Sequence, residues 1–82
     1  MKNYQEIYNN SLNAYKVGRT EGATTYLNKL TKRELLELNR ELNISEYIKD
    51  SYSKKKIIEY IVFIGIQTDI ESEAIRTLNI KG

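Results

Sequence analysis

The 82-residue chain contains neither cysteine nor histidine. Without cysteine there is no disulfide framework and no thiolate metal site. Without histidine, the commonest general base and metal ligand is missing as well. These absences exclude most catalytic templates, and the remaining residues offer no nucleophile with a base to activate it. We therefore expect a protein that is not an enzyme and that holds neither a cofactor nor a metal ion.

Long hydrophobic runs are also absent. The longest apolar stretch, IIEYIVFIGI at residues 57–66, is interrupted by Glu59 and is too short to span a bilayer. The first ten residues lack the apolar run of a signal peptide, so we expect a cytoplasmic protein without membrane contact. A chain of this length forms one small domain, residues 1–82, and buries only about 60% of the surface that its unfolded chain exposes.

Neither sign of charge dominates, because the formal net charge is only +2. This value is mild for a protein that binds nucleic acid. Any such function therefore has to depend on where the basic residues cluster.

Proline is absent too, and the apolar residues recur at helical spacing. We predict an amphipathic helix over residues 3–17, with Gly18 placed to end it. Its apolar stripe consists of Tyr4, Ile7, Tyr8, Leu12 and Tyr15. A weaker helix follows over residues 20–30, because Gly22 and two β-branched threonines lower its helix propensity. Its core positions are Ala23, Tyr26, Leu27 and Leu30.

The strongest helix start in the chain lies at residues 30–35. Thr31 can cap a helix while Glu34 reaches back to the Thr31 amide, and Leu30 can pack on Leu35. This pattern is a capping box with a hydrophobic staple, so the helix should begin at Lys32. Its inner stripe is Leu35, Leu38 and Leu42, and Asn43 can adopt the left-handed conformation that ends it.

The second half of the chain begins with a polar, turn-prone stretch, NISEYIKDSYS at residues 43–53. It predicts an extended loop anchored by Ile44, Tyr47 and Ile48. Ser53 then caps a helix whose inward positions are Ile57, Ile58, Ile61 and Ile64. Thr68 with Glu71 forms another capping box, for a C-terminal helix over residues 68–80. The expected fold class is all-α, a small domain of four to five helices.

The run LTKRELLELNRELNISEYIKDSYSKKKIIEYIV resembles the helix, extended loop, helix unit of the SAP and Rho termination factor N-terminal families. The length of its loop favours the Rho-like version. Asn43 stands where these families usually have glycine. The matching residues are Leu30, Thr31, Glu34, Leu35, Leu38, Leu42, Ile44, Lys55 or Lys56, Ile57, Ile58 and Ile61. We therefore expect a SAP-like unit at residues 29–66.

This resemblance implies nucleic-acid binding, with DNA favoured over RNA, through the N-terminal ends of the two helices. The charges point the same way, because a lysine run at a helix start opposes the helix dipole unless an anion is bound there. Lysine and arginine also cluster at the start of the preceding helix. We predict a phosphate-binding surface of low sequence specificity, formed by Lys29, Lys32, Arg33, Tyr52, Ser53, Lys54, Lys55 and Lys56.

Alternative interpretations stay open for several of these features. The lysine run is also what an ordinary solvated first turn looks like. Tyr47 and Tyr52, in the loop, are candidates either for base stacking or for packing of the loop. The acidic residues Asp69, Glu71 and Glu73 suit helix capping better than a metal site.

A different class of function is also consistent with the sequence. A Tyr/Ile-rich surface left over from the core could bind a larger protein of DNA replication or recombination. The chain would then be an adapter or accessory subunit. Salt separates the two hypotheses, because phosphate contacts weaken steeply with salt and an apolar interface does not.

Overall fold

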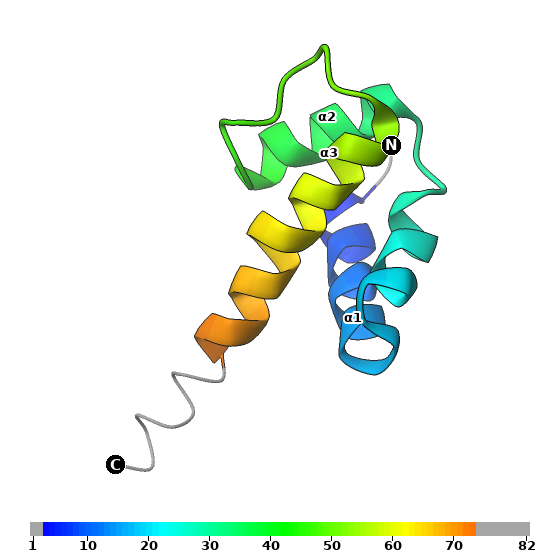
Figure 1. The fold of residues 1–82 in the computed structure, drawn as a ribbon, viewed down its shortest axis with the longest axis vertical. Coiled ribbons are helices and arrows are strands. Elements are labelled where there is room, and N and C mark those ends of the chain that lie inside the picture. Colours follow the sequence, from blue (N-terminus) through cyan, green and yellow to red (C-terminus); the bar gives the residue numbers. More distant parts are fainter. Residues whose placement is uncertain (1–2, 74–82) are drawn as a thin grey trace.

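The computed structural model describes residues 3–73, and these form a domain of three helices (Figure 1). α1 spans Tyr4–Leu27, α2 spans Lys32–Leu42 and α3 spans Lys54–Tyr60. A π-helical segment, η1 at Ile61–Ile66, continues α3, and residues 67–73 continue the same rod as α-helix. The all-α class is confirmed, whereas the expected four to five helices are reduced to three.

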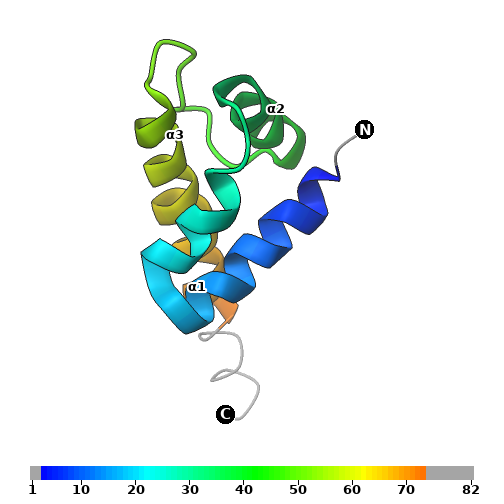
Figure 2. The same cartoon turned by 90° about the vertical axis from the view of Figure 1, so that its right-hand side faces the viewer.

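The helix end expected at Gly18 lies next to a kink inside α1. α1 runs on to Leu27, and the chain turns at Arg19, where φ is 53° and ψ is −140°. Figure 2 shows the two halves of α1 meeting at this turn. Gly22 permits their close approach, because a Cβ there would lie 2.4 Å from the carbonyl oxygen of Ala14. A side chain at position 22 would therefore not fit in this turn.

The boundary that the structure corrects is the capping box expected at Thr68. Residues 67–73 are already helical, so Thr68 lies inside the rod that begins with α3 and does not start a helix. The remainder of the predicted C-terminal helix, residues 74–80, falls outside the described residues. Because the helix continues without a break from α3 through η1, no new helix starts at Thr68.

The other predicted caps are confirmed. The Thr31 hydroxyl accepts the Glu34 N–H at 3.2 Å, and the Glu34 carboxylate accepts the Thr31 N–H at 2.9 Å. Asn43 ends α2 in the left-handed conformation, with φ 52° and ψ 49°. The Ser53 hydroxyl accepts the Lys56 N–H at 3.2 Å at the start of α3. Residues 43–53 form the expected loop between the two helices.

One hydrophobic core joins all three helices, the loop and η1. Its buried members are Tyr4, Tyr8, Ala23, Leu27, Leu30, Leu35, Leu38, Ile48, Ile57, Ile58, Ile61, Val62 and Ile66. Tyr15 and Leu42 pack against this core while half-buried. Two predictions are wrong, since Tyr26 is 39% exposed and Ile64 is 38% exposed. Tyr47, expected as an anchor of the loop, is exposed as well.

The π-helical segment explains the exposure of Ile64. Its backbone bonds reach five residues back, as in the bond from the Gln67 N–H to the Val62 carbonyl, so each residue turns less about the axis than in an α-helix. The inward-facing positions therefore shift along the chain to Gly65 and Ile66, which are buried. Ile64 turns outward, and Gly65 lies where a Cβ would come within 2.9 Å of Ile44 Cγ2.

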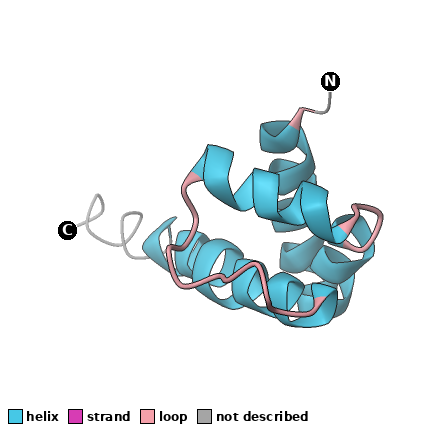
Figure 3. Cartoon of the chain, turned by 90° about the horizontal axis from the view of Figure 1, so that it is seen from above, coloured by secondary structure: helices cyan, strands magenta, loops and turns pink. Residues whose placement is uncertain are grey.

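The loop at residues 43–53 sets the relative direction of α2 and α3. It runs back alongside α3 from the end of α2, so both helices begin on the same side of the molecule (Figures 1 and 3). The short connection at residues 28–31 lies on that side too, because it leads from the end of α1 into α2 (Figure 3).

Among the described residues, no helix has the length and apolar character needed to cross a membrane.

Candidate nucleic-acid interface

The side on which α2 and α3 begin carries a concentration of positive charge. Residues 28–34 and 53–59 hold six of the chain's thirteen Lys and Arg residues but only two of its eleven acidic residues. We call Lys29, Lys32, Arg33, Lys54, Lys55 and Lys56 the basic surface. The mild net charge of the whole chain therefore hides a strong local asymmetry.

Lys54 connects the two halves of the basic surface. Its ammonium donates a hydrogen bond to the Asn28 carbonyl oxygen at 2.9 Å, and its side chain is half-buried. Asn28 is the C-terminal cap residue of α1. Lys54 thus holds the start of α3 against the end of α1, and Ser53 is likewise occupied as the cap of α3.

Two tyrosine rings position two further lysines of the basic surface. The Lys56 ammonium lies 4.1 Å from the centroid of the Tyr52 ring, and the Lys29 ammonium lies 5.2 Å from the centroid of Tyr26. Contacts of this kind are worth about 0.5–1 kcal/mol at exposed sites. They limit where each ammonium can move, and both ammonium groups stay at the surface.

Tyr52 serves the packing of the loop. Its ring is half-buried and lies 5.4 Å from the ring of Tyr60, at an interplanar angle of 55°. With Lys56 over the ring and Tyr60 beside it, packing explains its placement without a stacked base. Tyr26, which was expected in the core, also lies beside the basic surface. At 39% exposed, it is more exposed than Tyr52.

Most residues of the basic surface face solvent. Lys29, Arg33, Lys55 and Lys56 are exposed, and Lys32 is half-buried in the first turn of α2. The first amides of a helix point out of its end without partners inside the helix. At both starts the third amide is already capped, by the Thr31 and Ser53 hydroxyls, so the charged side chains lie beside only the first two amides of each helix.

A groove of about 540 Å³ borders the basic surface. One wall is the second half of α1, through Thr20, Thr24 and Asn28. The other wall is α3, through Lys54, Lys55, Ile58 and Glu59. The four-residue spacing of Thr20, Thr24 and Asn28 places them on one helical face. That spacing is visible in the sequence, but the groove exists only because α3 packs alongside.

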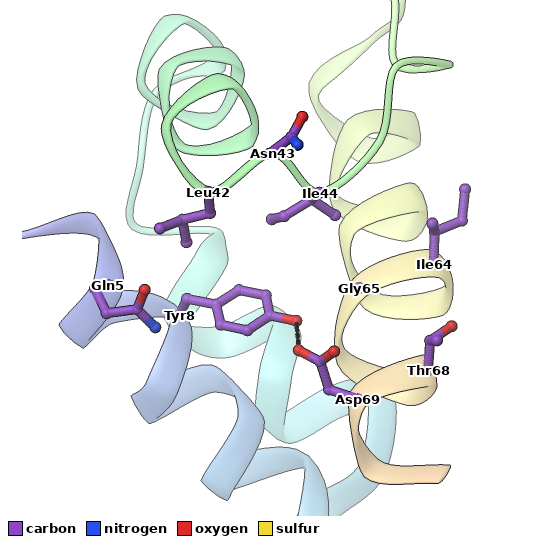
Figure 4. Close-up of a pocket in the computed structure, with 9 residues that line it drawn as sticks. All are labelled: Gln5, Tyr8, Leu42, Asn43, Ile44, Ile64, Gly65, Thr68 and Asp69. Atoms are coloured by element: carbon purple, nitrogen blue, oxygen red, sulfur yellow. Dashed lines mark hydrogen bonds between the residues drawn. The ribbon is translucent and has the colours of Figure 1, made fainter. Parts of the chain in front are cut away.

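A smaller hollow of about 340 Å³ lies between α1, the end of α2 and the η1 rod (Figure 4). The Tyr8 hydroxyl donates a hydrogen bond to Asp69 at 2.6 Å across it. Burial, followed by this hydrogen bond, raises the pKa of Tyr8. This contact ties the N-terminal helix to the end of the rod.

The acidic residues near the end of the rod bind side chains and do not cap a helix start. Asp69 accepts the bond from Tyr8, and Glu71 accepts one from Gln67 at 3.3 Å. Glu73 lies 3.5 Å from the Lys16 ammonium. The expected capping role is therefore wrong, because the helix passes through these residues without beginning there.

No group of acidic side chains in the described part of the chain is arranged to hold a metal ion.

No protein-family model matches the sequence, and comparisons with curated proteins and with solved structures gave no match. The site therefore has to be interpreted from its own geometry.

Proposed function

We propose that the chain is a non-enzymatic nucleic-acid-binding module that holds phosphates on the basic surface, with DNA favoured. The observation that carries this proposal is the adjacency of two basic helix starts, at α2 and α3, on one side of the molecule. Each start alone would be an ordinary solvated turn. Together they offer separate anchoring points for a negatively charged backbone.

The residues of the basic surface divide into two groups by their contacts. Lys54 is committed to the Asn28 carbonyl and Ser53 to the α3 cap, so both position the surface. Lys29, Arg33, Lys55 and Lys56 are exposed and can reach phosphates. Lys32, half-buried, adds charge at the α2 start.

The arrangement also supports the SAP-like interpretation of residues 29–66. That resemblance implies two helices whose N-terminal ends contact nucleic acid together. In this chain α2 and α3 begin on one side, joined by a long loop, and Asn43 takes the left-handed conformation for which glycine is usual. The proposal of DNA as the favoured polymer comes from this resemblance.

Salt dependence of binding tests the proposal. Fluorescence anisotropy with labelled DNA and RNA, from about 50 to 200 mM salt, yields a slope that reports the number of phosphates bound. Arg33→Ala/Lys55→Ala should weaken binding and reduce that slope by about one for each phosphate that the variant no longer holds. Lys54 is left intact, because its replacement would also disturb the hydrogen bond to the end of α1.

A matched control is available in Arg40→Ala/Lys49→Ala. It removes one arginine and one lysine, both exposed, from outside the basic surface. The control should keep the wild-type slope, because its charges lie away from the two helix starts. Equal losses of affinity in both double variants would mean diffuse attraction to net charge, and absence of wild-type binding would refute the proposal.

A second candidate function is supported by exposed apolar side chains on η1. Phe63 is 53% exposed and its neighbour Ile64 is 38% exposed. These residues suit the adapter hypothesis, in which the chain binds a larger DNA-processing protein. Partner binding would then survive high salt and be abolished in Phe63→Ser/Ile64→Ser, whereas Arg33→Ala/Lys55→Ala would leave it intact.

A further inference from the structure

The groove between α1 and α3 opens beside Lys55, one of the exposed lysines of the basic surface. Its volume of about 540 Å³ lies within the range of about 300–1,000 Å³ found for small-molecule sites. A phosphate held on Lys55 would therefore place the rest of its nucleotide at the mouth of this groove.

We propose that the groove receives an unpaired base from a bound single strand, whose phosphate lies on Lys55. This inference rests on the proposed function and adds the form of nucleic acid that is bound. Ile58 and two threonines, Thr20 and Thr24, are among its lining residues and give the groove apolar atoms for the faces of a base. The Asn28 amide and the Glu59 carboxylate supply polar partners for its edge.

Access to the groove selects against a duplex. In a double helix the bases are stacked and their pairing edges are occupied, so a base enters a protein pocket only after leaving the stack. A single strand meets this requirement at much lower cost. The groove therefore predicts tighter binding of single-stranded than of double-stranded nucleic acid at equal salt.

Glu59 gives the groove a preference among bases. The oxygens of its carboxylate accept hydrogen bonds, so they favour bases that present an amino group, as cytosine does through N4. Thymine and uracil have no amino group. Oligo-dC should therefore bind more tightly than oligo-dT, and Glu59→Gln, which introduces a donor beside the acceptor, should reduce this difference.

The test compares four labelled ligands by anisotropy: oligo-dC, oligo-C RNA, an abasic strand with the same number of phosphates, and a duplex. We expect oligo-dC to bind about tenfold more tightly than the abasic strand, a ratio typical of one well-buried apolar contact. Thr24→Leu, which fills the groove, should remove that advantage. Thr25→Leu is the matched control, since Thr25 is exposed on the same helix and does not line the groove.

The outcomes separate this inference from the proposed function. If abasic and intact strands bind equally, or if Thr24→Leu and Thr25→Leu behave alike, the groove does not hold a base while phosphate binding stands. If the RNA strand shows the same base-dependent gain as DNA, the groove accepts an unpaired base from either polymer and the inference holds. If no ligand binds at all, the proposed function fails, and the inference fails with it.

Discussion

Arg19 is the residue at which the path of the chain departs most from what its type prefers. Its φ of 53° with ψ of −140° lies in a region that glycine occupies readily and other residues occupy at a cost. Such conformations cost about 1–3 kcal/mol and persist when the surrounding structure enforces them. Here the two halves of α1 approach closely at Gly22 and Ala14, as expected for a turn that packing enforces.

Replacing Arg19 by glycine should therefore stabilise the fold, by about 1 kcal/mol after the greater flexibility of the unfolded chain is counted. Urea unfolding monitored by circular dichroism measures the change. Val17→Gly is the matched control, because Val17 is also exposed but lies in the regular part of α1. That change should destabilise the fold, and two destabilisations of similar size would show that the turn at Arg19 is not strained.

Two tyrosine hydroxyls make the fold sensitive to alkaline pH. The hydrogen bond to Glu37 at 2.7 Å, together with burial, raises the pKa of Tyr4 from 10.0 to about 12. Burial and the bond to Asp69 act on Tyr8 in the same direction. Each phenol thus loses its proton more easily in the unfolded chain than in the folded one. The contribution of Tyr4 to stability is complete below pH 10 and declines as the pH rises from 10 to about 12.

The free energy of unfolding should accordingly fall between about pH 10 and pH 11.5 more steeply in wild type than in Tyr4→Phe, which has no proton to lose at this position. Urea titrations at fixed pH values measure both slopes. Tyr47→Phe serves as the control, because the Tyr47 ring is 67% exposed and its variant should follow wild type. Parallel curves for wild type and Tyr4→Phe would contradict the assignment.

For single residues, the sequence predicts those placements that depend on neighbours a few positions away in the chain. Thr31, Asn43 and Ser53 are placed correctly because their partners lie within a few residues. Tyr26 could not be placed, since its spacing suits the core while its ring lies beside Lys29 at the surface. Whether Tyr26 lies in the core or at the surface depends on how α1 packs against the other helices.

Among the elements, η1 determines which side of the rod formed by α3, η1 and residues 67–73 faces the core. A π-helical segment is rare and often marks a site with special requirements. In this chain it brings Gly65 and Ile66 inward together and turns Ile64 outward. The helical periodicity of residues 57–64 could not reveal this, because it assumes a constant number of residues per turn.

Gly65→Ala tests the packing of η1 directly. The added Cβ would lie 2.9 Å from Ile44 Cγ2 and 3.1 Å from the Tyr8 hydroxyl oxygen, so we expect a loss of about 1–2 kcal/mol from overpacking. Gly18→Ala is the counterpart, because nothing lies within 4 Å of its added Cβ. It should stabilise α1 by about 0.5–1 kcal/mol, and a gain in both variants would mean that the rod does not pack tightly at Gly65.

For the whole molecule, α1 is the element that completes the core formed by α2, the loop and α3. Four buried residues of the core, Tyr4, Tyr8, Ala23 and Leu27, come from α1, and Lys54 holds α3 to its end. A unit of two helices and a loop buries too little surface to fold well alone. The sequence predicted this dependence, and the two helices that it placed in residues 3–30 correspond to the halves of α1 on either side of the kink at Arg19.

A fragment of residues 29–82 should therefore lose cooperative folding. We expect low helicity by circular dichroism and no sigmoidal thermal transition, since the fragment lacks the buried side chains that α1 contributes to the core. Mixing it with a peptide of residues 1–28 should restore part of the helical signal. Cooperative unfolding of the fragment alone would show that α1 is an addition to an independent domain.

The distribution of charge over the whole molecule carries the functional proposal. The basic surface was recognisable in the sequence as two clusters, at residues 29–33 and 54–56. The adjacency of the two clusters in space could not be recognised from the sequence, because it depends on the loop at residues 43–53 running back along α3. The groove was invisible for the same reason, since its two walls come from α1 and α3, which are far apart in the sequence.

The most direct test of the central claim is a titration of ¹⁵N-labelled protein with a short DNA strand, followed by amide chemical shifts at low salt. We predict that the largest shifts fall on residues 28–34 and 53–59 and that Arg33→Ala/Lys55→Ala reduces them. Shifts confined to residues 60–64 would support the adapter surface instead. Shifts absent or spread evenly over the molecule would contradict a phosphate-binding surface at the starts of α2 and α3.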